Sequence, residues 1–456
     1  MNRLYQKFLF PAHRLFLGRN ILPHFFATQS QQWLSRSALL DLQNQRLRRL
    51  LTHAIKNVPY YRQKFPRTGL PLNHTFGPKQ LACLPVLTKT ELRGNLDDLM
   101  ASNFSRKDLV TRSTGGSTGV PTVFFYDRNS WDSRVAAKYA AFSWAGWDFG
   151  VRTGILAGSP IDRAVFGSML GKLKSALFRE LVLDTFDMRL SQRRRDIARL
   201  QRFRPRVLIG YTSACLALAR QLLQDGSSLS IPSIIVSAEM LFPDHREIIE
   251  RAFHGQVFNL YGSRETAAIG MECRFHTGFH TAINRYVVEI LRDDTPVAFG
   301  EEGEIVITDL LNYGMPFIRY KIGDFGKFLN AECPCGRKLP LLELTQGRIT
   351  DIIITSEGKQ LPGEFFPHLF KEIAPYVEQF QIIQERIDEL TVTIVPAPSY
   401  GPGQTEYLKT KIQDKVGPLV KIVFRLVETI PPEKSGKHRV TISKLDETAL
   451  FRMEPS

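Results

Sequence analysis

Residues 113–122 read STGGSTGVPT, a run of glycine, serine and threonine that ends in Pro121 and Thr122. Glycine permits backbone turns that other residues resist, and such turns can direct successive N–H groups toward phosphate oxygens. The hydroxyl side chains add further donors with little bulk. No Gly-Lys-Ser/Thr sequence closes the run, so it is not a Walker loop. The run predicts a phosphate-binding loop, and a plain flexible turn of the same composition is the alternative.

Short strands and helices alternate along the chain after this loop. Apolar and β-branched runs predict four strands, at residues 123–126, 153–157, 207–210 and 234–237. The clearest unit leads from the last of these through a helix opened by Pro243 to a strand at 256–260. Such units favour a mainly parallel sheet with helices on its faces, which binds ligands beyond the carboxyl ends of its strands. Residues 261–265 follow one such end.

The length of 456 residues exceeds one ordinary domain. Apolar residues make up 43% and charged residues 23%, as in soluble globular proteins. We expect neither a membrane-spanning helix nor a signal peptide, because no apolar run approaches about 18 residues. After residue 346 the pattern changes to strand-like segments at 390–395 and 422–426. The sequence therefore predicts an α/β fold with a large N-terminal domain, residues 1–346, and a small C-terminal α+β domain, residues 347–456.

The net charge of +15 is concentrated near the N-terminus. Residues 1–64 hold eleven lysines and arginines against a single acid, Asp41. One interpretation is a solvated basic face. The other is contact with an anionic membrane surface, because apolar side chains are interleaved with the charges. We expect no nucleic-acid binding, since no recognition motif accompanies the charge. Leu47, Leu50, Leu51 and Ala54 recur at helical spacing and predict an amphipathic helix that ends near residue 57.

Five cysteines in so long a chain do not make a disulfide scaffold, and the expected location is the reducing cytoplasm. Cys83 and Cys215 have apolar neighbours and are expected to be buried. The other three lie with two histidines in two clusters sixty residues apart. Thiolates and imidazoles suit tetrahedral zinc. We predict a structural zinc site of Cys273, His280, Cys333 and Cys335, with His276 as the alternative fourth ligand; unconnected thiols are the other interpretation.

Five segments follow the loop in a fixed order, and together with it they resemble the motifs of adenylate-forming enzymes, the superfamily of acyl-CoA synthetases, adenylation domains and luciferases. The segments are Ser237-Ala238-Glu239, Tyr261-Gly262-Ser263-Arg264-Glu265, Arg319-Tyr320-Lys321-Ile322-Gly323-Asp324, Gly347-Arg348-Ile349-Thr350-Asp351 and Lys434-Ser435-Gly436-Lys437-His438-Arg439. The fourth departs from the family pattern, because Thr350 replaces an acid.

This resemblance implies a role for each matched residue. Lys437 and Glu265 are the catalytic candidates, Lys437 as the adenylation lysine and Glu265 as the carboxylate that holds Mg²⁺. Tyr261 lies against adenine and Asp324 accepts hydrogen bonds from the ribose. The residues implied in nucleotide binding are Ser113, Thr114, Gly115, Gly116, Ser117, Thr118, Gly119, Ala238, Glu239, Tyr261, Gly262, Ser263, Asp324 and Arg348.

Within the superfamily, Gln45 and the segments 59–62 and 87–89 resemble the phenylacetate-CoA ligase branch, especially its relatives from capsule and exopolysaccharide gene clusters. The resemblance implies ATP-dependent activation of a carboxylic acid to an acyl-adenylate, then thioester formation with coenzyme A after rotation of the small domain. Two alternatives stay open. One is an adenylyltransferase or transfer to an acceptor other than coenzyme A. The other is a non-catalytic binding protein on the same fold.

Overall fold

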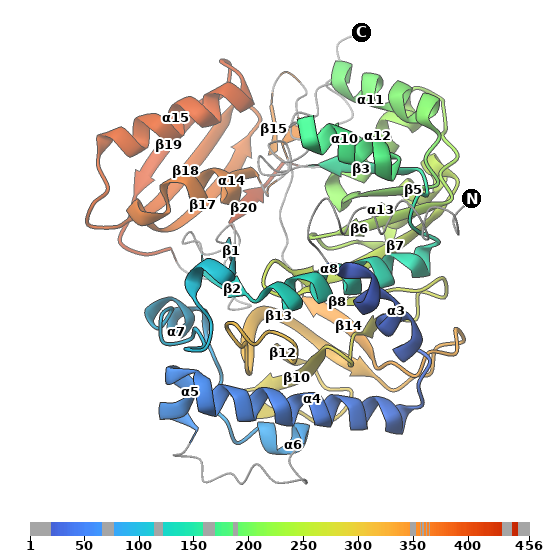
Figure 1. Cartoon of the computed structure of the whole chain (residues 1–456). Coiled ribbons are helices and arrows are strands. Elements are labelled where there is room, and N and C mark those ends of the chain that lie inside the picture. The colour runs from blue at the N-terminus through green and yellow to red at the C-terminus, as the bar shows by residue number, and fades with distance from the viewer. Residues whose placement is uncertain are drawn as a thin grey trace. The chain divides into compact units, whose positions relative to one another are not determined.

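The computed structural model describes residues 20–65, 77–113, 122–157, 169–185, 190–346, 353–355, 357, 360–361, 363, 365–430 and 440–445. These residues fall into two compact units (Figure 1). The first unit draws on the ranges 1–113, 122–149 and 258–347, and the second on 150–257 and 348–456.

The second unit contains a parallel sheet whose strands follow the order β6-β5-β3-β4. Its strands are β3 (Thr153–Ala157), β4 (Glu180–Asp184), β5 (Val207–Tyr211) and β6 (Ser233–Ser237), and its helices are α10 (Met169–Phe178), α11 (Leu190–Phe203), α12 (Thr212–Gln224) and α13 (Pro243–Phe253). Apolar side chains of the strands and of α12 and α13 form its core. The strands predicted at 153–157, 207–210 and 234–237 and the helix that begins at Pro243 are confirmed.

The first unit contains an antiparallel sheet in the order β7-β8-β9-β14-β13-β12-β10-β11. Its strands are β7 (Gln256–Ser263), β8 (Ala267–Met271), β9 (Phe279–Thr281), β10 (Tyr286–Arg292), β11 (Thr295–Pro296), β12 (Gly303–Asp309), β13 (Tyr320–Leu329) and β14 (Leu341–Gln346). The α/β class is confirmed. The antiparallel part was not visible in the strand-helix-strand pattern, because these strands are joined by hairpins and loops.

Helices of the N-terminal part complete the first unit. They are α3 (Ile21–Gln31), α4 (Arg36–Asn57), α5 (Pro59–Lys64), α6 (Pro78–Leu81), α7 (Lys89–Gly94), α8 (Arg128–Phe142) and the 3-10 turns η3 (Arg106–Asp108) and η4 (Ser143–Ala145). The hydroxyl of Ser35 caps α4 by accepting from the N–H of Ala38. The predicted apolar stripe of α4 is fully buried, and each such leucine contributes about 1.5–3 kcal/mol. Strands β1 (Val110–Ser113) and β2 (Val123–Tyr126) pair antiparallel.

The C-terminal region forms a sheet in the order β19-β18-β17-β20 with its own apolar core. Its elements are β15 (Ile353–Ile354), β16 (Gln360–Leu361), α14 (Phe365–Phe370), η5 (Lys371–Tyr376), β17 (Val377–Arg386), β18 (Glu389–Pro396), α15 (Pro402–Val416), β19 (Lys421–Leu426) and β20 (Thr441–Ser443). The predicted small α+β region is confirmed, and the boundary at residue 346 stays a prediction. Among the described helices, none combines the length and apolarity needed to cross a membrane.

Candidate functional site

The segment predicted to hold nucleotide and Mg²⁺ lies at the hairpin between β7 and β8. Ser263 pairs with Ala267, so residues 264–266 form the tip, and the register shifts between Tyr261 and Gly262. A Cβ on Gly262 would lie 1.6 Å from the carbonyl oxygen of Ala267, so only glycine permits this approach. Ala267 adopts a φ of +66°, which is costly for an alanine. Such strain is typical of functional sites, where the surrounding structure holds it in place.

Side chains from distant parts of the chain hold the hairpin tip. The carbonyl oxygens of Arg264, Glu265 and Thr266 each accept a side-chain hydrogen bond. Their donors are Arg134, Tyr126 and Tyr286, in that order. A carbonyl left without a partner in this buried place would cost about 1–3 kcal/mol. The tip is therefore fixed by contacts that sequence reasoning missed, since its donors lie 20 to 139 residues away.

The carboxylate of Glu265 is also held from within the protein. Tyr320, the first residue of β13, donates its hydroxyl to Oε1 of Glu265 over 3.1 Å. Glu265 and Tyr320 are both buried. Tyr320 belongs to the Arg319–Asp324 motif, so its position in the sequence is a signal for this contact. Arg319 itself, by contrast, is buried against Glu289 and the carbonyl oxygens of Ala82 and Leu84, a structural role.

A buried ion pair supports the tyrosine that contacts the tip. Arg285 contacts Asp309 at 2.9 Å and donates from Nε to the hydroxyl of Tyr286 over 2.8 Å. Burial opposes the charge of Arg285, but the Asp309 carboxylate raises its pKa above the ordinary value. Burial raises the pKa of Tyr286 to about 12, so its hydroxyl stays a donor. Arg134 lies 5.0 Å over the ring of Tyr126, which orients its guanidinium at the tip.

Two of the predicted nucleotide residues meet directly. The hydroxyl of Tyr261, in β7, donates to Oδ2 of Asp324, in β13, over 3.2 Å. Both side chains are buried. This bond orients the carboxylate that the sequence assigns to the ribose.

The other predicted adenine segment lies in the second unit, after β6. Ala238 has a φ of +72°, an unusual conformation for alanine. Both carboxylate oxygens of Glu239 accept bonds from Ser213, one from its N–H over 2.6 Å and one from its hydroxyl over 2.8 Å. Glu239 therefore caps the N-terminus of α12, where a negative charge is favourable.

Several predicted residues lie outside the described part of the chain. They are Thr114, Gly115, Gly116, Ser117, Thr118, Gly119, Arg348 and Lys437. Ser113 is described as the last residue of β1 and pairs with Val123 of β2. The paired strands therefore hold the two ends of the predicted phosphate loop at neighbouring positions of one ladder.

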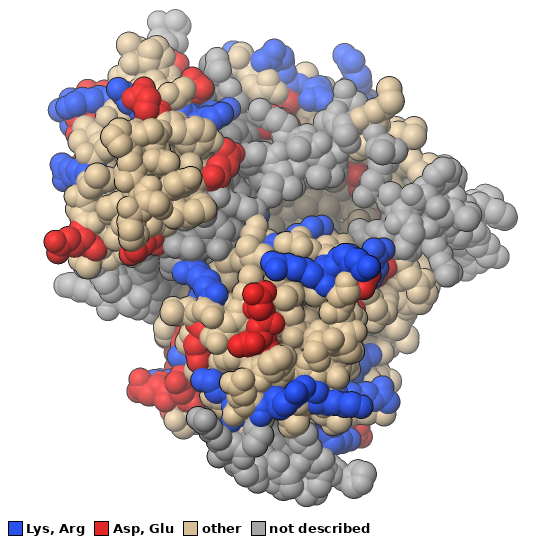
Figure 2. Space-filling model, turned by 60° about the vertical axis from the view of Figure 1, so that its left-hand side comes forward, with Lys and Arg blue, Asp and Glu red and all other residues tan. Residues whose placement is uncertain are grey.

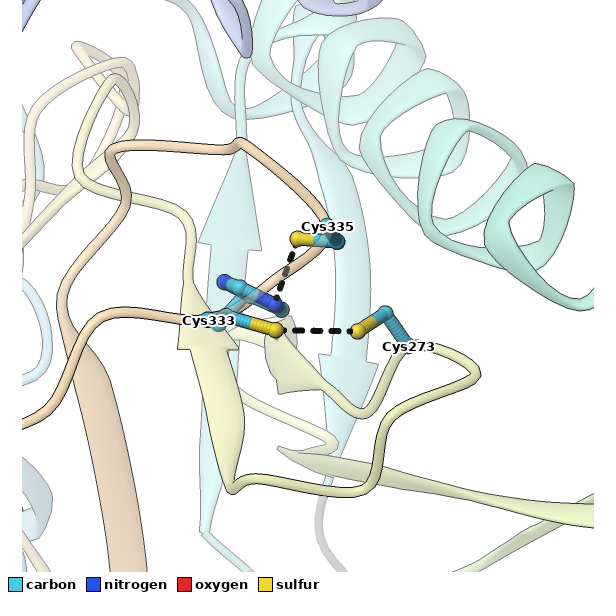
Figure 3. A group of neighbouring side chains, drawn as sticks. Cys273, Cys333 and Cys335 are labelled. Atoms are coloured by element: carbon cyan, nitrogen blue, oxygen red, sulfur yellow. Dashed lines mark hydrogen bonds between the residues drawn. The ribbon is translucent and has the colours of Figure 1, made fainter.

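The predicted zinc ligands come together in the first unit. Their four ligand atoms, from Cys273, His280, Cys333 and Cys335, all lie within 4.8 Å of one another. In Figure 3, Cys333 and Cys335 share one loop, and Cys273 faces Cys333 from another. The Sγ atoms of Cys273 and Cys333 are 3.4 Å apart, and Sγ of Cys335 is 3.3 Å from Nε2 of His280.

Sheet pairing accounts for this convergence. Cys273 follows β8, His280 lies in β9, and the loop 330–340 joins β13 to β14. Because β9 pairs with both β8 and β14, the three segments meet at one place. Gly336 closes the Cys333–Cys335 turn at a φ of +84°, and its N–H donates to the carbonyl of Cys333.

The donor set fits zinc. Tetrahedral zinc with Zn–S near 2.3 Å places its ligands roughly 3.5–3.8 Å apart, close to the spacings seen here. Burial, followed by the charge of Arg337, lowers the pKa of His280 to about 4, so the imidazole is neutral as a metal requires. Burial raises the pKa of Cys273 to about 12, whereas hydrogen bonds outweigh burial at Cys333 and lower its pKa. His276 is not part of the cluster; its Nδ1 lies 3.3 Å from Glu272.

Comparison with known proteins relates this architecture to characterised families. The family model of the CapK C-terminal domain matches residues 353–444. The phenylacetate-coenzyme A ligase of Thermus thermophilus is 26% identical over 436 residues, which span 89% of this chain and 96% of that protein. The enzyme of the same name from Escherichia coli is 29% identical over a match that spans 78% of this chain and 82% of that protein. Protein CapK of Staphylococcus aureus is 24% identical, over 95% of both chains.

Solved structures share the fold. A 2-hydroxyisobutyryl-CoA ligase, in complex with its acyl-AMP and CoA, superposes with a TM-score of 0.63 at 20% identity and covers 92% of both chains. A postadenylation-state structure of a 2-hydroxyisobutyryl-CoA ligase gives a TM-score of 0.57 over 91% of this chain and 90% of that one, at 20% identity.

Proposed function

We propose that the chain is an adenylate-forming enzyme of the phenylacetate-CoA ligase-like branch, which activates a carboxylic acid with ATP and then forms a thioester with coenzyme A. The observation that carries the proposal is the hairpin tip, where Glu265 is buried and its backbone and side chain are both held by distant residues. A surface glutamate would not need such support. The relatives match over nearly the full chain, which supports an activity that uses both the large and the small region.

Each residue at the hairpin has a task in this chemistry. Glu265 would hold Mg²⁺, because a carboxylate suits a hard cation that also binds phosphate. When bound, Mg²⁺ offsets negative charge on the transferring nucleotide. Asp324, oriented by the hydroxyl of Tyr261, would accept the ribose hydroxyls, and the ring of Tyr261 would lie against adenine. These residues bring the substrate carboxylate and the α-phosphate together against their mutual repulsion.

The remaining roles rest on sequence resemblance. Residues 113–119 would donate N–H and hydroxyl hydrogen bonds to phosphate, Arg348 would contact the nucleotide, and Lys437 would neutralise charge during adenylation. Ala238 and Glu239 would contribute to the adenine site through backbone atoms, since both oxygens of the Glu239 carboxylate already accept bonds from Ser213.

The experiment is pyrophosphate release trapped with hydroxylamine, measured with aryl, fatty and sugar acids. We expect one class of acid to stimulate release and the product to become a thioester when coenzyme A is added. Release without thiol dependence would favour transfer to another acceptor, for which the sequence resemblance to capsule and exopolysaccharide relatives suggests a substrate from polysaccharide synthesis. If no acid stimulates release above background, the protein is a binding protein on this fold.

We also propose that Cys273, His280, Cys333 and Cys335 hold one structural Zn²⁺. Four protein ligands leave no open position for water, so the ion would tie the β8, β9 and β13–β14 segments together and take no part in chemistry. Elemental analysis of protein purified without added metal should give close to one zinc per chain. A chain that is fully folded and metal-free would contradict this proposal.

Finally, we propose a cytoplasmic location with the basic segment 1–64 at an anionic membrane surface. Helix α4 carries five basic residues and one acid, Asp41. Figure 2 shows lysine and arginine side chains gathered along the lower part of the first unit, at the level of α4 in Figure 1. Such a band favours anionic partners and weakens with added salt.

A further inference from the structure

Residues 20–35 form a surface segment without Asp, Glu, Lys or Arg; they read NILPHFFATQSQQWLS. Helix α3 lies within this segment, packs beside α8 and leads into α4 (Figure 1). Its inner face is fixed, because Ile21 and Phe25 are buried and Gln29 donates to the hydroxyl of Ser143 over 2.6 Å. The segment is thus a firmly attached part of the first unit.

The outer face of this segment is apolar. Phe26, in α3, is 50% exposed, and Trp33, in the turn that follows α3, is 57% exposed. Leu34, in the same turn, and Leu40, in the first turns of α4, are also exposed. A surface helix ordinarily presents charged side chains to solvent, whereas α3 presents the ring of Phe26. We call Phe26, Trp33, Leu34 and Leu40 the α3 surface. Four exposed large apolar side chains within fifteen residues favour an interaction surface.

Cations border this surface. The guanidinium of Arg337 lies 4.7 Å from the ring of Trp33, and Arg36 donates to the carbonyl oxygen of Lys338. Acids are also present, since Lys338 pairs with Glu332 at 2.8 Å and Asp41 is exposed. The described cations thus outnumber the acids by one. The sequence that precedes the segment adds Arg3, Lys7, Arg14 and Arg19 and no acid.

We infer that the α3 surface docks on an anionic lipid surface, with α3 parallel to the membrane plane. Aromatic rings with one polar edge, such as that of Trp33, favour the boundary between headgroups and acyl chains. An apolar face bordered by cations fits a lipid boundary whose headgroups are negative. No described helix could cross the bilayer, so the contact would be peripheral. This inference rests on the proposed membrane contact of residues 1–64 and not on the ligase activity.

The test is flotation of the full-length protein with lipid vesicles. Wild type should float with an equimolar mixture of phosphatidylcholine and phosphatidylglycerol and much less with phosphatidylcholine alone. The double variant Phe26→Ser, Trp33→Ser should reduce the partition coefficient at least about tenfold, because two aromatic side chains no longer leave water. Both residues are exposed, so the unfolding midpoint should stay close to that of wild type.

The matched control is Phe299→Ser, which removes an aromatic side chain of the same unit that is 63% exposed but lies between β11 and β12. This control should float like wild type. A second variant, Arg36→Gln with Arg337→Gln, should reduce the preference for phosphatidylglycerol while binding to neutral vesicles changes little.

Three outcomes would overturn the inference. One is equal flotation of wild type and the double variant, and another is no flotation of wild type with either vesicle. The third comes from light scattering: if wild type is a dimer and the double variant a monomer, the α3 surface binds a second copy of the chain.

Discussion

The two ends of strand β8 carry two candidate sites that are held in opposite ways. At its first residue, Ala267, the hairpin tip with Glu265 receives hydrogen bonds from tyrosine and arginine side chains of the protein. About 15 Å away, beyond its last residue, the thiols and His280 contact one another, and Thr277 also contacts Cys333.

The difference concerns what each site needs in order to stay in place. The hairpin tip is organised by the protein's own donors, so its geometry should persist without ligand. The cysteine cluster brings together three thiols whose deprotonated forms would repel one another, and a bound cation removes that repulsion. The following predictions test this contrast.

Removal of metal should have the largest effect on stability. Cys335→Ser should abolish zinc retention and lower the free energy of unfolding by more than about 4 kcal/mol, since loss of a structural metal is among the costliest changes. Denaturant unfolding with and without a chelator measures this, and the variant should no longer respond to the chelator. Cys83→Ser is the control, because that thiol is exposed and outside the cluster. If wild type and Cys335→Ser have the same free energy of unfolding, the cysteine cluster does not depend on a metal and the two sites do not differ in this way.

Breaking the buried Arg285–Asp309 ion pair should lower the free energy of unfolding nearly as much as losing the metal, although no metal is involved. Arg285→Met leaves Asp309 buried without its cation, which costs about 3–5 kcal/mol. Chelation should lower the stability of this variant as much as that of wild type. The double variant Arg285→Met, Asp309→Asn should cost less than the sum of the single changes in denaturant unfolding. Simple additivity would mean that the pair does not act as a unit.

Glu265→Gln should reduce the rate of adenylate formation by about 10²–10³, by analogy with the loss of one electrostatic contact in a transition state. Its unfolding should barely change, because glutamine can still accept from Tyr320. Pyrophosphate release measures the adenylation step, and thioester formation from presynthesised acyl-adenylate should be retained. Glu343→Gln, a surface residue paired with Lys327, is the control. Equal losses in both half-reactions would argue against a role in adenylation.

The smallest effect is expected from Tyr320→Phe. The variant lacks one hydrogen bond to the Glu265 carboxylate, worth about 1.5 kcal/mol, so the Mg²⁺ concentration for half-maximal activity should rise about tenfold at a similar maximal rate. Tyr60→Phe removes a comparable hydroxyl that donates to Glu91 elsewhere and should leave the Mg²⁺ requirement unchanged. An unaltered Mg²⁺ requirement in Tyr320→Phe would show that Tyr320 has only a packing role.

Much of the local structure was predictable because its signals lie within a few residues. The apolar spacing of Leu47, Leu50 and Leu51 predicted α4, and the strand runs predicted β2 and β3 with their observed bounds. Ordered motifs also predicted the similarity to phenylacetate-CoA ligases, since each motif is short and contiguous. The four members of the cysteine–histidine cluster were predictable as a set, because cysteine and histidine are rare enough for their grouping to be informative.

Partners that are far apart in the sequence emerged only in the folded chain. Tyr126 and Glu265 are 139 residues apart, and Arg134 and Arg264 are 130 apart, so no local pattern joins them. The same holds for the choice of His280 over His276, which follows from the register of β9 with β8 and β14. Cys83 has apolar neighbours in sequence yet is exposed, contrary to expectation, whereas Cys215 is buried as expected. Periodicity and composition report on the few residues around a position, but burial, register and hydrogen-bond partners depend on which distant segments pack against it.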